Sequence, residues 1–96
     1  MRAIEQTSRF KRDLKREAQG PHQLLLKTHF VTLLGSLAND QPLANKHHDH
    51  ALAGRWKNHR ECHVAPDLLL IYKKLDTGKG GCLQLTRLGS HSELFG

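Results

Sequence analysis

The chain has 96 residues, 38% of them hydrophobic and 25% charged, which is typical of one folded domain over residues 1–96 and argues against a disordered polypeptide. Fifteen lysines and arginines against nine acidic residues give a net charge of +6, which favours a polyanionic partner: nucleic acid, a ribosome, an acidic protein or an anionic membrane surface. No apolar run approaches the roughly 20 residues of a membrane span, and the N-terminus is polar, so we expect a cytoplasmic protein without a signal peptide.

The N-terminal half predicts a strand followed by two helices. Residues 2–7 predict a short first strand, and Ser8 is a candidate N-cap for a helix over residues 9–19, whose apolar residues recur every four positions. A Gly-Pro pair then breaks the chain, and a broad apolar stripe predicts the main core helix over residues 22–37. Two helices joined by so short a turn form an αα-hairpin.

The C-terminal half predicts a loop and three strands. Residues 38–54 lack a sustained apolar period and are predicted to form a loop. Residues 55–64 alternate, residues 68–74 are almost continuously apolar, and residues 82–88 follow a glycine-rich turn, so each stretch predicts a strand. The order β-α-α-β-β-β predicts an α+β fold, with an antiparallel sheet, the helices on one side and a short C-terminal helical turn.

The alternation in residues 55–64 predicts which of their side chains share a face. It places Trp56 and Cys62 on one side and a polar set on the other: Arg55, Lys57, His59, Glu61 and His63. This set is either an ordinary solvated face or a catalytic surface, with histidines for proton transfer and Arg55 and Lys57 neutralising phosphate. Asp67, just beyond, is either a turn residue or a carboxylate that orients a neighbouring imidazole.

Two features bear on metal binding and disulfides. The segment KHHDH, residues 46–50, concentrates three histidines and an aspartate, which are ligand types for zinc and nickel. Adjacent side chains point apart, so three alternatives stay open: a solvated loop, a metal site, or an acid–base role for His50 at the end nearest the strand. Cys62 and Cys82 lack C-x-x-C spacing, and in a cytosolic chain we expect free thiols.

The last strand and the C-terminal turn carry further candidates. Arg87 lies among apolar neighbours, so it is either paired structurally or held out towards a phosphate. Ser90 and Glu93 match the S-x-x-E capping box and predict a helical turn that starts at His91. His91 and Phe95 lie at i, i+4 and share one face of that turn. They either dock the turn, with Phe95 filling the core, or belong to a site.

Three ordered blocks carry a family resemblance: "HDHALAGRWK", "RECHVAPDLLLIYK" and the terminal "GSHSELFG". They resemble the YafQ-like branch of the RelE/ParE toxin superfamily, which are small ribonucleases of bacterial toxin–antitoxin systems, and the resemblance covers residues 46–96 well. It implies a RelE-like, microbial-ribonuclease-type fold. It also implies an endoribonuclease that cleaves mRNA in the ribosomal A site by attack of a ribose 2′-OH, without a metal or other cofactor. The implied partners are a cognate antitoxin, the ribosome and mRNA, with no membrane.

On matching positions, the resemblance carries over His50, His63, Asp67, His91 and Phe95 as active-site residues. His91 would be the general acid, and either His50 or His63 the general base, with the other supporting the phosphate. Asp67 would orient or charge-tune a histidine, and Phe95 would stack against an extruded base. We expect four residues to bind RNA: Phe95 through its ring, and the cations Arg55, Lys57 and Arg87 through their charge.

Two other classes of function stay open. A ParE-like protein on the same fold would inhibit DNA gyrase without catalysis, and such a protein would not need convergent histidines. A non-catalytic RNA- or metal-binding module would use the KHHDH segment as its site. The chain also departs from the family pattern at one position, because Leu68 stands where the residue after Asp67 is usually aromatic.

Overall fold

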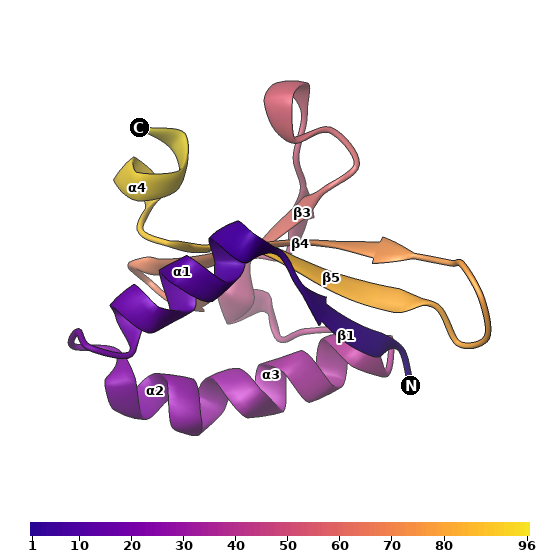
Figure 1. Cartoon of the computed structure of the whole chain (residues 1–96), viewed down its shortest axis with the longest axis horizontal. Coiled ribbons are helices and arrows are strands. Elements are labelled where there is room, and N and C mark those ends of the chain that lie inside the picture. The colour runs from indigo at the N-terminus through magenta and orange to yellow at the C-terminus, as the bar shows by residue number, and fades with distance from the viewer.

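The fold is a five-stranded sheet with helices packed against it. The computed structural model describes residues 1–96 (Figure 1). Its elements are, in order, β1 (Ala3–Gln6), α1 (Ser8–Glu17), α2 (Gln23–Lys27), α3 (His29–Ala38), η1 (Asn45–His47), β2 (His50–Ala51), η2 (Gly54–Trp56), β3 (Arg60–Ala65), β4 (Leu68–Leu75), β5 (Cys82–Gly89) and α4 (His91–Phe95). None of the helices has the length and apolar character that a membrane crossing requires.

The strands lie in the order β1–β5–β4–β3–β2. The predicted α+β class is confirmed, since the helices and the sheet form separate layers (Figure 1). The sheet is mixed rather than wholly antiparallel, because β1 runs parallel to β5 while the other strand pairs are antiparallel. The two ends of the chain therefore meet in one sheet, and β1 depends on β5 for its pairing.

The first helix starts from a cap that also contacts the sheet. Thr7, and not Ser8 as predicted, is the N-cap of α1. Its Oγ1 accepts the Phe10 N–H at 3.0 Å and donates to the Thr86 carbonyl at 2.8 Å. One hydroxyl thereby satisfies a free donor of the helix and a carbonyl of β5, which joins the start of α1 to that strand.

The helix predicted over residues 22–37 is two helices, α2 and α3, that meet at Thr28. The backbone angles of Thr28, φ −124° and ψ −89°, lie outside the helical region. Its hydroxyl donates to the Leu24 carbonyl at 2.9 Å, a bond to the preceding turn that competes with continuation of the helix. The apolar stripe still packs inward, because both helices contribute buried residues: Leu26, Phe30, Leu33, Leu37 and Ala38.

The main core lies between these helices and one face of the sheet. Alternate residues of β3, β4 and β5 complete it: Cys62, Val64, Leu68, Leu70, Tyr72, Leu83, Leu85 and Leu88. A smaller cluster lies on the opposite face, where Leu94 of α4 and Trp56 pack against Leu69 and Ile71. The long helices therefore cover one face, and the other face lies beneath α4 and the segment of residues 52–59 (Figure 1).

The strand predicted over residues 55–64 begins only at Arg60. Residues before it form η2 and a turn in which Asn58 has φ +70°, a left-handed conformation that asparagine tolerates. The predicted face of Trp56 is therefore wrong: it packs against the sheet on the face opposite to Cys62. Both cysteines, Cys62 and Cys82, are free and buried.

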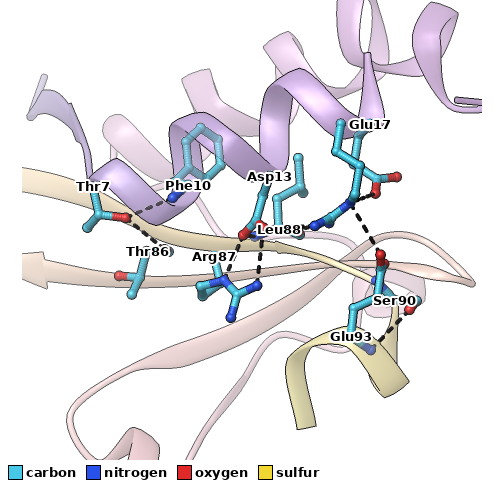
Figure 2. Close-up of polar contacts among 10 residues, drawn as sticks. Thr7, Phe10, Asp13, Glu17, Thr86, Arg87, Leu88, Ser90 and Glu93 are labelled. Carbon is cyan, nitrogen blue, oxygen red and sulfur yellow. Dashed lines mark hydrogen bonds and ion pairs between the residues drawn. The ribbon is translucent and has the colours of Figure 1, made fainter. Parts of the chain in front are cut away.

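Helix α1 completes the edge of β5 beyond the end of β1 (Figure 2). Strand β1 covers β5 only from Cys82 to Leu85. Further along, Asp13 accepts the Leu88 N–H at 3.0 Å, and Arg16 donates to the Leu88 carbonyl at 2.8 Å. Side chains of the helix thus replace a neighbouring strand, so the backbone groups of this edge keep their hydrogen bonds.

The same Asp13 carboxylate binds Arg87. It accepts Arg87 Nε at 2.7 Å and Nη2 at 3.1 Å, and the two side chains are 5% and 11% exposed. Of the two alternatives for Arg87, the structure therefore contains the paired one. Burial by itself raises the pKa of Asp13, but the bonds from Arg87 and from the Leu88 N–H outweigh burial and hold that pKa below 3.8. Arg16 also pairs with Glu93 at 3.2 Å, which ties α4 to α1.

Candidate active site

Strand registers place three polar residues and one isoleucine in a row across the face beneath α4. His50 of β2 pairs with Glu61 of β3, Glu61 with Ile71 of β4, and Ile71 with Arg87 of β5. Directly paired residues project to the same face of a sheet. Because Ile71 packs with Leu94 of α4, this row lies on the α4 face and not on the face of the main core.

The neighbouring row brings the end of β5 close to α4. His63 pairs with Leu69, and Leu69 pairs with Gly89. A Cβ atom at Gly89 would lie 2.9 Å from Arg16 Nη2 and 3.3 Å from Leu94 Cδ2. Glycine at this position therefore allows α4 to turn back closely over the sheet.

A hollow of about 430 Å³ opens between this row and the start of α4. Its lining comes from β3, β4, the β3–β4 turn and the first residues of α4: His63, Pro66, Asp67, Leu69, Ser90, His91 and Ser92. Three of the four predicted catalytic residues, His63, Asp67 and His91, therefore line one hollow, and His91 reaches it from a separate part of the sequence.

Helix α4 holds His91 at its first position. The predicted capping box is confirmed: Ser90 Oγ accepts the Glu93 N–H at 3.2 Å, and Glu93 Oε1 accepts the Ser90 N–H at 2.8 Å. The bond from the Ser90 N–H lowers the pKa of Glu93. Leu94 takes the buried position, while Phe95 is 37% exposed and its ring centroid lies 5.0 Å from that of His91. Phe95 therefore does not fill the core, and its ring stands open beside His91.

Asp67 binds an imidazole that the sequence analysis did not single out. His22 Nε2 donates to Asp67 Oδ1 at 3.0 Å, and Nδ1 of the same ring lies 3.4 Å from Glu17 Oε1. The hydrogen bond from His22 lowers the pKa of Asp67. No local pattern reveals this pair, because His22 and Asp67 are 45 positions apart and meet only in the folded chain. His22 thus anchors a carboxylate at the rim of the hollow.

His63 is held by two residues that sequence reasoning did not name as its partners. Its Nε2 lies 3.5 Å from Oε1 of Glu61, whose side chain is buried. From the other side, His47 Nδ1 donates to the His63 backbone carbonyl at 2.7 Å. A buried carboxylate beside an imidazole can orient the ring. Glu61 and His47 are therefore candidates for holding His63 in position.

The other predicted site residues are not part of the lining of the hollow. His50 is exposed in β2, two strands from Ile71 along the same row. Arg55 and Lys57 are exposed in the segment of residues 52–59, off the strand on which they were predicted. Arg87 is paired as described above. The hollow itself therefore contains imidazoles and a carboxylate, and the arginine and lysine side chains lie outside its lining.

The side chains of the KHHDH segment divide among several roles. His47 is buried beneath β3, and Asp49 accepts Tyr72 Oη at 2.7 Å and Arg60 Nε at 3.2 Å. The remaining three side chains, Lys46, His48 and His50, are exposed. Nowhere in the chain do three histidine, cysteine or acidic side chains gather closely enough to hold a metal ion.

The arrangement supports acid–base chemistry on a bound ligand. His63 comes from the sheet and His91 from α4, and both face the same hollow. Two imidazoles in one cavity can take a proton from one atom and give a proton to another near neutral pH. The exposed ring of Phe95 beside His91 adds a surface on which an unpaired base can stack.

Comparison with known proteins agrees with this geometry. A family model described as "Bacterial toxin of type II toxin-antitoxin system, YafQ" matches residues 2–96. The chain belongs to the YafQ toxin family. It is 40% identical over 96 residues to the mRNA interferase toxin YafQ of Escherichia coli, covering 99% of this chain and 97% of that relative.

Solved YafQ structures share the fold. The crystal structure of YafQ from Escherichia coli matches with a TM-score of 0.79 and 37% identity over the full length of both chains. A chain from the Escherichia coli DinJ-YafQ complex matches with a TM-score of 0.77 and 33% identity, again over both full lengths. The resemblance to the YafQ branch is therefore confirmed, and the ParE-like alternative is not favoured.

Proposed function

We propose that this member of the YafQ family is an endoribonuclease that cleaves mRNA on the ribosome and so inhibits translation. The observation that carries the proposal is the hollow lined by His63, Asp67 and His91, with Phe95 beside His91. A relative that is 40% identical is named an mRNA interferase toxin, which supports activity on messenger RNA. The net charge of +6 suits a polyanionic substrate.

The proposed reaction takes one proton and gives another. A base removes the proton of a ribose 2′-OH, the freed oxygen attacks the adjacent phosphorus, and the bond from phosphorus to the 5′-oxygen breaks. An acid then protonates the leaving 5′-oxygen. The products are a 2′,3′-cyclic phosphate and a 5′-hydroxyl. We assign His63 as the base and His91 as the acid because both line the hollow, and His50, exposed on the same face, supports the phosphate.

Other residues position the substrate around this pair. Asp67, anchored by His22, orients the groups at the rim, and Phe95 stacks on an extruded base. The exposed cations of the 52–59 segment, Arg55 and Lys57, neutralise phosphates along the RNA, whereas Arg87 is held by Asp13 and takes no part. Every proton transfer is assigned to a side chain of the protein itself, so protein that is dialysed against EDTA and then freed of the chelator should still cleave mRNA when it is added to ribosomes.

We propose a cognate antitoxin as the protein partner. The related Escherichia coli YafQ has been crystallised in a complex with DinJ. A surface with a net charge of +6 suits an acidic or extended segment that covers the hollow. Binding of the antitoxin should then protect His91 from modification by diethyl pyrocarbonate. Unchanged modification of His91 in the complex would contradict coverage of the hollow.

Primer extension on cellular mRNA after brief expression tests the function. Wild type should introduce discrete cuts, and His91→Ala and His63→Ala should each lower cleavage by about 100- to 10,000-fold, the usual contribution of a general acid or base. His59→Ala is the matched control, because its ring packs edge-on against Trp56 and does not line the hollow. A folded His91→Ala variant with wild-type cleavage would refute the role of His91, and absence of cleavage by wild type would refute the function.

A further inference from the structure

A second cavity, of about 580 Å³, adjoins the hollow. It shares His63 and Pro66 with the hollow, so the two are neighbouring depressions with a common wall. Its other walls come from the α2–α3 region, from η1 and from the end of β3. A cavity of this volume is in the range that small ligands occupy in proteins.

The walls of this cavity are unusually rich in imidazole rings. His29 and His47 stack with centroids 5.2 Å apart and planes at 25°, and the ring of His48 lies 5.2 Å from that of His63. Lys46 adds an exposed ammonium group at the wall. The apolar part of the lining comes from three residues: Leu25, Val64 and Ala65. Flat rings, an apolar floor and one cation suit a nucleobase that stacks and a phosphate that pairs.

The cavity is built into the fold and is not an accident of a loose loop. His47 is 7% exposed, and its bond to the His63 carbonyl fixes η1 against the end of β3. His48 follows with φ +46°, a left-handed conformation, and its ring reaches towards His63. The adjacent histidines therefore separate into a buried support, His47, and an exposed ring, His48.

We propose that this cavity binds the nucleotide next to the scissile phosphate of the RNA substrate. The proposal rests on the proposed function, because the position of the scissile phosphate is taken from His63 and His91. Since His63 lines both depressions, a phosphate held there leaves the neighbouring nucleotide at the mouth of the second cavity. Its base lies against the ring of His48, and its phosphate pairs with Lys46. An acidic protein segment is less well matched, because Lys46 is the only lysine or arginine in the lining.

Binding of an uncleavable oligoribonucleotide to the full chain tests this assignment. The probe is a short RNA with 2′-O-methyl riboses, which cannot form the cyclic phosphate, and its affinity is measured by fluorescence anisotropy. His48→Ala should weaken binding about tenfold, the order expected for loss of one base stack, whereas His48→Phe, which keeps a flat ring, should retain most of the affinity. Lys46→Ala should weaken binding and reduce its salt dependence.

Two matched controls lie outside the cavity. His59→Ala removes an imidazole beside Trp56, and Lys79→Ala removes an exposed lysine from the β4–β5 turn; both should bind the probe as wild type does. Equal affinity for His48→Ala and His59→Ala would overturn the proposal. An acidic peptide that binds in a Lys46-dependent manner, with no binding of RNA, would overturn it in favour of a protein occupant.

Cleavage patterns separate this proposal from the proposed function. His48→Ala should still cut mRNA but lose the wild-type preference for the base flanking the cut. Cleavage by wild type with an unchanged flanking preference in His48→Ala would refute the cavity assignment and leave the function intact. Absence of cleavage by wild type, with probe binding that still depends on His48 and Lys46, would refute the function and reduce the cavity to a plain RNA-binding site.

Discussion

Replacing Asp13 by alanine should destabilise the protein more than any change at its surface. The substitution leaves Arg87, whose side chain is 11% exposed, without its carboxylate, and it leaves the Leu88 N–H without an acceptor. Loss of one partner of a buried ion pair costs about 3–5 kcal/mol, and the residual exposure of Arg87 places this pair at the lower end. The orphaned N–H adds about 1 kcal/mol. Arg16 contributes little, because at 42% exposed it regains water.

We therefore expect a loss of about 4 kcal/mol in the free energy of unfolding, a large share of the about 5–15 kcal/mol typical of a small domain. Urea denaturation followed by circular dichroism measures this loss. The free energy of unfolding falls by about 1–3 kcal/mol per molar urea, so the urea midpoint should fall by more than about 1 M. Asp76→Ala is the matched control: its carboxylate pairs with Arg2 at 2.8 Å but is 85% exposed, so its midpoint should barely change.

A double substitution separates the ion pair from simple loss of packing. Asp13→Leu with Arg87→Met removes both charges and should recover much of the stability lost in Asp13→Ala, because no unpaired charge stays buried. The reasoning would be refuted if Asp13→Ala shifted the midpoint no more than Asp76→Ala does. It would also fail if the double variant lost as much stability as the sum of the losses in Asp13→Leu and Arg87→Met alone.

The same pair predicts how stability depends on pH. The pKa of Asp13 in the folded protein lies below its ordinary 3.8, since the bonds from Arg87 and Leu88 outweigh burial. The stabilisation is therefore fully present above pH 3.8 and is lost as pH falls through the folded-state pKa. Acid titration of wild type and Asp13→Ala should show a flatter acid limb in the variant, and parallel limbs would contradict the assignment.

Three further predictions follow from other contacts. Ser90→Ala removes the capping hydroxyl of α4 and should cost about 1 kcal/mol of stability. It should also lower mRNA cleavage, since α4 no longer holds His91 in place; cleavage equal to that of wild type would contradict this. His22→Ala should raise the pKa of Asp67 back towards its ordinary value, measured by carbon NMR of the carboxyl group, because the hydrogen bond that lowers it is gone. Asp40 should titrate at about 2 in the same experiment, since Arg2 and Lys74 both donate to it, and an ordinary value would show that these exposed pairs do not persist.

Local sequence patterns predicted the parts of this protein that depend on near neighbours. The capping box of Ser90 and Glu93 spans one helical turn, so its two hydrogen bonds follow from spacing alone. The strands over residues 68–74 and 82–88 follow from their apolar runs, and both exist as β4 and β5. The ordered blocks around His63, Asp67 and His91 also indicated the family and three residues that share one hollow.

Only the tertiary structure decided which distant groups meet. Arg87 binds Asp13, which is 74 positions away in the sequence, and Asp67 binds His22, which is 45 positions away. Packing of the helices, and not local spacing, brings these pairs together. The parallel pairing of β1 with β5 likewise joins segments from opposite ends of the chain. The adjacent histidines of KHHDH show the same limit: His47 is buried beneath β3 and His48 is exposed, because the fold around each ring sets its burial and its partners.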